Sequence, residues 1–387
     1  MMRATSFHWL LMCVLACVAN QATAAVPPAP KLPADAYVLM DGTTGQVLVD
    51  HKGDLSLPPA SLTKIMTSYV LAEEVDAGRA SLDDMIKVSR NAWSQNPTFK
   101  GSSLMWIEPG KPVSLADLER GVIISSGNDA SVAVAEHLAG TESSFVAVMN
   151  QMAAELGLDN TVYRNPHGLP HPEHRTTARD LATLSVALIN GHPEHYRIYK
   201  EQSFTYNGIK QYNRNSLLRS DATVDGLKTG YTSEAGYGLI ASAQREDMRL
   251  VSVVLGSASK RTRAFENSSL LNYGFRFFQN LRPLSAEVTL IEPRVWKGAA
   301  ESLHAGVLES VVLTVPRERT EADIKVTVNE QLEAPLSRGD VIGSVQVVRG
   351  GEVLFETPLL VLECVPRGGF FKRLMDALIL WFQNLVD

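Results

Sequence analysis

Hydrophobic positions along this chain switch from strand-like runs to a helical spacing and back again. Two short apolar runs at 37–40 and 46–49 flank the turn 41–45, which predicts a β-hairpin. From Ser61 onward the apolar residues recur with the period of an α-helix, and this pattern fades near Gly78. The chain therefore begins its folded part with strands and continues with a helix.

A mostly helical middle part is followed by a second hairpin. Helical patterns cover 115–124 and 129–138, whereas 237–243 and 250–255 are strand-like runs on either side of a polar turn. Strands at both ends with helices between them imply one sheet built from distant segments. We expect residues 34–280 to form this α/β (α+β) domain.

Residues 281–366 have an all-β pattern and contain no catalytic constellation. We expect a small β-rich C-terminal domain that acts as a spacer or docking module. The expected strands are 288–291, 311–315, 324–328, 345–348 and 353–355, the last two joined as a hairpin.

The last segment, 367–387, has the pattern of an amphipathic helix. Its polar side chains fall within about a third of the helix circumference, and aromatic and aliphatic residues cover the rest. The uninterrupted apolar stretch is too short to span a bilayer. This pattern favours a helix that lies in the membrane interface and binds membrane lipids. A helix docked on the protein's own core is the alternative.

Residues 1–24 have the pattern of a secretory signal peptide. Arg3 supplies the positive start, 9–18 form a short apolar core, and Ala22-Thr23-Ala24 offers a small-residue cleavage site. We expect an exported protein on the outer (periplasmic) face of the cytoplasmic membrane.

Cleavage of this signal leaves one cysteine in the mature chain. Cys13 and Cys17 are removed with the signal, and Cys364 remains within an apolar run, where we expect a small buried side chain. A single thiol cannot form an internal disulfide. The net charge of −6 over 387 residues, without a basic and aromatic cluster, argues against a nucleic-acid partner.

Ser61 and Lys64 form the first candidate catalytic pair. Pro58 and Pro59 cannot continue a helix backward, so Ser61 belongs to the first helical turn, and Lys64 lies three positions on along the same face. A serine hydroxyl is a weak nucleophile that needs a base. Lysine acts as that base only if burial or a neighbouring cation lowers its pKa, and Lys228 is a candidate for that cation.

Two tripeptides complete the candidate site. Ser126-Gly127-Asn128 lies between two predicted helices, where Ser126 is placed to relay a proton and Asn128 to bind a substrate amide. Lys228-Thr229-Gly230 precedes the second hairpin, so we expect it on an edge strand that can bond a peptide and a carboxylate. The N–H groups of Ser61 and Tyr231 are candidates for an oxyanion hole.

These three motifs, in this order, resemble the low-molecular-mass penicillin-binding proteins, in particular the type-5 D-alanyl-D-alanine carboxypeptidases. The similarity extends over nearly the whole mature chain. Besides the motifs it includes residues 58–64, 121–124, 224–230, 232–237 and 274–278, the β-rich domain and the amphipathic terminus.

The resemblance implies a penicillin-binding transpeptidase-like fold, also found in serine β-lactamases, with an antiparallel sheet flanked by helices. It implies that Ser61 attacks the penultimate D-Ala carbonyl of a peptidoglycan pentapeptide, that water hydrolyses the acyl-enzyme, and that β-lactams acylate the same serine. It further implies that Arg263 helps Thr229 bind the terminal carboxylate and that Arg214 lies near the cleft. Tyr231 stands where the family commonly has histidine, and Gly238 replaces a more usual asparagine.

Two alternatives remain open from the sequence, and a third is disfavoured. A D,D-endopeptidase would use the same motifs on cross-links, and a non-catalytic, membrane-bound wall-binding protein would carry a decayed site. A class A β-lactamase would need a deacylating glutamate segment that the middle part lacks.

A histidine cluster in the middle of the chain raises the question of a metal-binding site. Prolines interrupt the spacing of His167, His171 and His174, which favours a solvated loop rather than a metal site. We expect neither a metal nor a cofactor.

Overall fold

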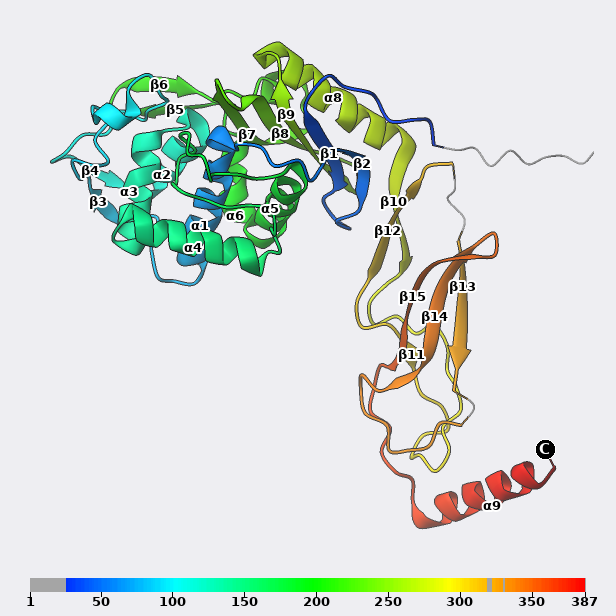
Figure 1. Ribbon diagram of the computed structural model, residues 1–387. Helices are drawn as coiled ribbons and strands as arrows, with labels where there is room; N and C mark the ends of the chain where they lie inside the picture. The colour runs from blue at the N-terminus through cyan, green and yellow to red at the C-terminus, as the bar shows by residue number, and fades with distance from the viewer. Residues whose placement is uncertain (1–25, 319–321, 330, 387) are drawn as a thin grey trace, which may run out of the picture.

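The computed structural model describes residues 26–318, 322–329 and 331–386. The predicted signal peptide, with Cys13 and Cys17, lies outside these residues. The molecule is elongated: a domain of sheet and helices forms one end, a β-rich domain follows, and a single helix lies at the far end (Figure 1).

A five-stranded antiparallel sheet forms the centre of the first domain, in the order β2-β1-β9-β8-β7. Both predicted hairpins are confirmed, and β1 pairs with β9, so the sheet joins the two ends of the domain. Within the part of the chain that the structure describes, strand β7 pairs with β8 alone and forms one edge of the sheet. The strands are β1 (Ala36–Asp41), β2 (Val47–His51), β7 (Val224–Thr232), β8 (Gly236–Arg245) and β9 (Met248–Ser257).

Helices cover both faces of this sheet because neighbouring strand residues point to opposite sides. Val38 and Val253 belong to the core shared with most helices, whereas Leu39 and Val254 belong to the core under α8 (Lys260–Phe277). The other helices are α1 (Lys64–Asp76), α2 (Leu115–Arg120), α3 (Asn128–Ala139), α4 (Glu142–Glu155), α5 (Ala178–Gly191), α6 (Pro193–Tyr196) and α7 (Leu217–Ser220).

Short elements surround this helical part. Two small hairpins pair β3 with β4 and β5 with β6. Their bounds are β3 (Met85–Lys87), β4 (Pro112–Ser114), β5 (Ser203–Tyr206) and β6 (Ile209–Tyr212). Three short 3₁₀ helices are described, η1 (Ala60–Thr63), η2 (Pro97–Phe99) and η4 (Arg197–Lys200). The element η3 (Gly121–Ser125) is a short π-helix.

The second domain consists of a two-stranded ribbon, β10-β12, and a four-stranded sheet, β11-β15-β14-β13. The predicted hairpin is confirmed as β14 and β15. A hydroxyl contact of 2.6 Å between Thr44 and Thr314 joins the two domains. The strands are β10 (Phe278–Leu284), β11 (Ala305–Gly306), β12 (Val311–Pro316), β13 (Asp323–Val328), β14 (Val341–Arg349) and β15 (Glu352–Val361).

Two local predictions in this part were wrong. Residues 288–291 do not form a strand: the amides of Leu290 and Ile291 both donate to the Ala305 carbonyl, a pattern that no regular ladder contains. Cys364 is exposed rather than buried, because it follows the end of β15, where the chain leaves the sheet.

The C-terminal helix α9 (Phe370–Val386) lies across the end of the second domain (Figure 1). Part of its polar strip faces the protein: Asp376 is buried and accepts a hydrogen bond of 2.7 Å from the Lys297 amide, whereas Gln383 is exposed. Among the described helices, none is long and apolar enough to cross a membrane. The exposed face carries Phe370, Phe371, Leu374, Met375, Leu378, Ile379, Trp381 and Phe382.

Candidate active site

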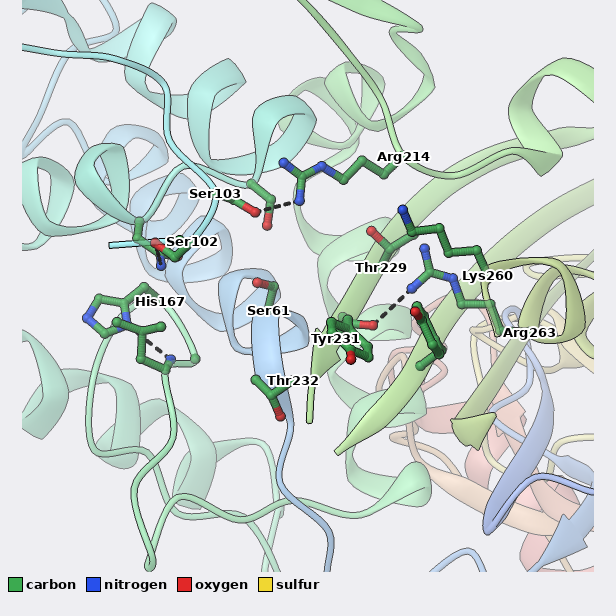
Figure 2. A pocket seen from close by; sticks show the side chains of 17 residues that line it. Ser61, Ser102, Ser103, His167, Arg214, Thr229, Tyr231, Thr232, Lys260 and Arg263 are labelled. Atoms are coloured by element: carbon green, nitrogen blue, oxygen red, sulfur yellow. Dashed lines mark hydrogen bonds between the residues drawn. The ribbon is translucent and has the colours of Figure 1, made fainter. Parts of the chain in front are cut away.

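Ser61 lies on the 3₁₀ turn η1, directly before α1. The predicted helix is therefore confirmed, but its regular part begins at Lys64 rather than at the serine. Ala60 has a φ of 48°, a left-handed backbone that alanine rarely adopts. This turn directs the Ser61 side chain into an open cavity between the helices and the sheet edge (Figure 2).

The Lys64 amine is buried beneath Ser61. Its Nζ is 3.3 Å from the Ser61 Oγ and donates hydrogen bonds to the Asn128 Oδ1, at 2.7 Å, and to the His167 carbonyl. Burial, followed by the positive charge of Arg214, holds the pKa of Lys64 well below its usual range. This shift favours the neutral amine, the form that a general base requires.

The second motif lies where two helices meet. Ser126 ends the π-helix η3 with a φ of 59°, and its hydroxyl is buried without a hydrogen-bond partner among the described residues. Asn128 begins α3, and its Nδ2 donates to the Ser102 Oγ at 2.9 Å. Asn128 thus connects the buried lysine to the opposite wall of the cavity.

Asp129 fixes this wall, although the sequence did not single it out. Its carboxylate accepts hydrogen bonds from the successive amides of Met105, Trp106 and Ile107, at 2.8, 2.8 and 3.2 Å. Burial raises the pKa of Asp129, against the effect of these donors. The segment held in this way presents residues 101–103 to the cavity.

The third motif lies on the edge strand β7, as predicted. Lys228 is buried, and its pKa lies well below the usual range because of burial and of the nearby charges of Lys64, Arg214 and Arg263. A Cβ on Gly230 would come within 3.1 Å of Leu62 and 3.2 Å of the Pro59 carbonyl. The strand therefore packs closely against the turn that carries the serine.

Two arginines and a tyrosine complete the cavity wall. Arg263 donates to the carbonyls of Gly230 and Gly238, at 2.9 and 3.1 Å, and burial lowers its pKa to about 10. Arg214 bonds to the Ser103 hydroxyl from the other side. Tyr231 is half exposed and stacks on Tyr237 with ring centroids 4.3 Å apart.

Two histidines of the predicted solvated loop are buried, so that prediction was wrong. His174 contacts the Thr63 hydroxyl at 2.9 Å, and the His167 carbonyl accepts the Lys64 hydrogen bond. Gly168 explains the tight approach, because its φ of +88° brings its backbone against the Ala60 carbonyl. The described residues contain no group of three or more metal-ligating side chains that could hold a metal ion.

The cavity has a volume of about 520 Å³. Of the predicted site residues, Lys64 and Lys228 lie buried behind its wall, and the others line it. The lining predicted residues are Ser61, Ser126, Asn128, Arg214, Thr229, Gly230, Tyr231 and Arg263. Sequence reasoning therefore found residues that the fold brings together, but missed the supporting ones.

An antiparallel sheet with helices on both faces, with a serine–lysine pair beside its edge strand, is the fold of the penicillin-binding transpeptidases. The structure of penicillin-binding protein 5 from Haemophilus influenzae superposes with a TM-score of 0.82 at 40% identity, covering 88% of this chain and 99% of that one. Penicillin-binding protein D2 from Listeria monocytogenes, solved with ampicillin bound, has a TM-score of 0.57 at 31% identity and covers 64% and 99%.

Family comparison gives the more specific assignment. Residues 21–259 match the D-alanyl-D-alanine carboxypeptidase family, and 278–367 match the C-terminal domain of penicillin-binding protein 5. The D-alanyl-D-alanine carboxypeptidase DacC of Escherichia coli is 46% identical over 361 residues, 92% of this chain and 90% of the relative. This chain belongs to the D-alanyl-D-alanine carboxypeptidase family of serine peptidases.

Proposed function

We propose that Ser61 is the nucleophile of this carboxypeptidase and that Lys64 is its base. The observation that supports this most directly is the environment of the Lys64 amine. A neutral amine has two hydrogens and one lone pair, and two carbonyl oxygens, from Asn128 and His167, take the hydrogens. The lone pair is then left for the Ser61 hydroxyl, 3.3 Å away.

The remaining side chains are assigned to the stages that follow attack. The backbone N–H groups of Ser61 and Tyr231 stabilise the oxyanion, and Ser126, with its unpartnered hydroxyl, passes a proton to the leaving amine. Asn128 positions the substrate amide. Lys228, Thr229 and Arg263 bind the terminal carboxylate, with Gly230 allowing close approach and Arg214 adding positive charge.

The substrate of this site is the pentapeptide stem of peptidoglycan, from which the terminal D-Ala leaves. The acyl group on Ser61 is then transferred to water. β-Lactam antibiotics acylate the same serine. The oxyanion role uses only the Tyr231 backbone, so replacement of the usual histidine leaves that role intact.

The test is the release of D-Ala from a pentapeptide by the wild-type protein and by Ser61→Ala. We expect steady release by the wild type and none by the variant. A cross-linked dimer is supplied in parallel, because an endopeptidase would use the same residues. Cleavage of the dimer alone would replace the carboxypeptidase assignment, and no cleavage of either peptide would favour a wall-binding protein.

We further propose that α9 holds the exported protein at the outer face of the cytoplasmic membrane. The helix presents its aromatic and aliphatic side chains outward, while Asp376 ties the polar side to the second domain. A broad apolar face of this kind buries into the interface between lipid headgroups and acyl chains. The active site then lies at the opposite end of the elongated molecule (Figure 1).

A further inference from the structure

The cavity carries more positive charge than the removal of alanine requires. An alanine leaving group brings one carboxylate, yet Arg214, Lys260 and Arg263 all line the cavity. No aspartate or glutamate is among the lining residues. The cavity is therefore suited to a substrate with more than one negative group.

Lys260 is the cation that the carboxypeptidase reaction does not use. It is the first residue of α8 and lies three positions before Arg263, so the two side chains are neighbours on one face of the helix. Figure 2 shows both on the same side of the cavity as Thr229, away from Ser102 and His167. Lys260 is exposed and has no hydrogen-bond or ion-pair partner within the described residues.

The position of Lys260 in α8 makes its charge costly without an anion. Ser259 caps the helix, and the first turn contains Lys260, Arg261 and Arg263 but no acidic residue. The positive end of the helix dipole repels these cations and favours an anion instead. Lys260 is therefore a cation of the cavity lining whose position favours an anionic ligand beside it.

We propose that this enzyme also accepts leaving groups that carry a second carboxylate, and that Lys260 binds it. The proposal rests on the roles assigned to Ser61, Thr229 and Arg263 above. Thr229 and Arg263 hold the C-terminal carboxylate of an acidic D-residue, and the side-chain carboxylate reaches Lys260 one helical turn away.

The chemical step is that of the known reaction. The Ser61 oxygen bonds to the D-Ala carbonyl carbon, and the C–N bond to the acidic residue breaks. The leaving amine takes up the proton that Ser61 released. Water then adds to the ester, which frees the peptide acid and restores the Ser61 hydroxyl. No further reactant is needed.

The test compares three peptides that differ only in the last residue, ending in D-Ala-D-Ala, D-Ala-D-Glu or D-Ala-D-Gln. The glutamate and glutamine forms have nearly the same shape and differ in charge. In the wild type we expect kcat/KM to be about fivefold higher for D-Glu than for D-Gln, the size of one partly exposed ion pair. The ratio should fall as salt is added.

Variants of α8 identify the residue responsible. Lys260→Ala should bring the D-Glu to D-Gln ratio close to one, and Lys260→Glu should bring it below one. Arg261→Ala is the matched control: it removes the same charge from the adjacent, exposed position that does not line the cavity, and should keep the wild-type ratio.

A ratio near one in the wild type, or one that is equal in the wild type and Lys260→Ala, would overturn the proposal. An equal fall of the D-Glu to D-Gln ratio in Lys260→Ala and Arg261→Ala would also overturn the proposal. The preference would then come from the overall positive potential of this region and not from contact with Lys260. Failure of the wild type to hydrolyse D-Ala-D-Ala would instead refute the carboxypeptidase roles, so the two failures are distinguishable.

Discussion

At the scale of single residues, the proposed reaction depends most on the environment of the Lys64 amine. This amine is buried away from water and lies near the positive charge of Arg214. Two carbonyl oxygens, from Asn128 and His167, accept its hydrogen bonds. Loss of hydration disfavours the ammonium form and so favours the neutral amine that a base requires. The acid limb of the acylation rate should therefore lie well below the ordinary lysine range.

Replacement of Lys64 by arginine tests this account. A guanidinium keeps the positive charge but cannot lose its proton, so we expect acylation by penicillin to slow by about 10²–10⁴-fold, the usual contribution of a general base. Stopped-flow measurement of acylation between pH 5 and 10 follows the loss. Lys111→Arg, at an exposed surface position, is the control. A variant that keeps wild-type acylation would exclude Lys64 as the base.

His174 makes the fold sensitive to acid. The Thr63 hydroxyl donates to the Ala60 carbonyl, so it accepts from the His174 Nε2, and the buried Nδ1 has no hydrogen-bond partner among the described residues. Burial, with nearby positive charges, lowers the pKa of His174 to about 4 from an ordinary 6.5. Above pH 6.5 the ring is neutral in both states and contributes nothing. Between pH 6.5 and pH 4, His174 is protonated in the unfolded chain but stays neutral in the folded chain. The free energy of unfolding therefore decreases as the pH falls through this range.

The corresponding prediction concerns His174→Gln, which keeps a donor but cannot titrate. Relative to this variant, the wild type should lose about 3 kcal/mol of unfolding free energy between pH 6.5 and pH 4. Urea unfolding at a series of pH values measures the difference. His171→Gln, in the exposed part of the same loop, is the control. A stability difference that stays constant with pH would contradict the buried neutral histidine.

At the scale of elements, the site depends on how closely the 165–176 loop approaches the turn η1. A Cβ on Gly168 would meet the Ala60 carbonyl oxygen at 1.8 Å, and the glycine already has a φ of +88°. Backbone atoms cannot make room as a flexible side chain does. The loop thus supports both the serine turn, through Ala60, and the base, through the His167 carbonyl.

Gly168→Ala should therefore abolish penicillin acylation and destabilise the domain by more than the roughly 1–2 kcal/mol cost of a left-handed alanine. Gly157→Ala is a matched control, since Gly157 also has a positive φ of +68° but nothing within 4 Å of its added Cβ. Thermal unfolding and labelled-penicillin binding separate the two effects. Equal behaviour of the two variants would show that the close packing is unimportant.

The sequence predicted the elements that carry the motifs because each has a strong local pattern. Proline before Ser61 and the helical period after it placed the serine at a helix start, and the run after Lys228 placed that motif on an edge strand. The supporting contacts were not predictable in this way. Thr63 meets His174 across 111 positions, and Lys64 meets the His167 carbonyl across 103, so no local pattern reports them.

Other misses have a similar origin. Residues 288–291 have the composition of a strand, but tertiary hydrogen bonds to Ala305 override that preference. In α9 the amphipathic pattern was recognised, whereas the burial of Asp376 against Lys297 depends on a segment 79 positions away. Cys364 lies within an apolar run of the sequence, but its side chain is exposed in the folded protein.

At the scale of the whole molecule, the structure separates the site from the exposed apolar helix. Among the residues whose burial is described, the core of the second domain contains none from α9. Truncation after Pro366 should therefore release the protein from phospholipid vesicles without changing kcat/KM for a soluble tripeptide. Vesicle sedimentation and the peptidase assay measure these two properties.

A second variant keeps the helix and removes its apolar character. Leu378→Glu combined with Trp381→Glu changes two exposed side chains and leaves Asp376 in place. This variant should also remain in the supernatant. Sedimentation of either form with the vesicles, at the level of the full chain, would contradict the membrane role of α9.

The most direct test of the central assignment is to map the bond that penicillin forms. The protein is incubated with benzylpenicillin, digested, and analysed by peptide mass spectrometry, with Ser61→Ala treated in parallel. The account predicts one penicilloyl adduct, on the Ser61 hydroxyl, and none on the variant. An adduct on another serine, or an equal adduct on Ser61→Ala, would contradict it.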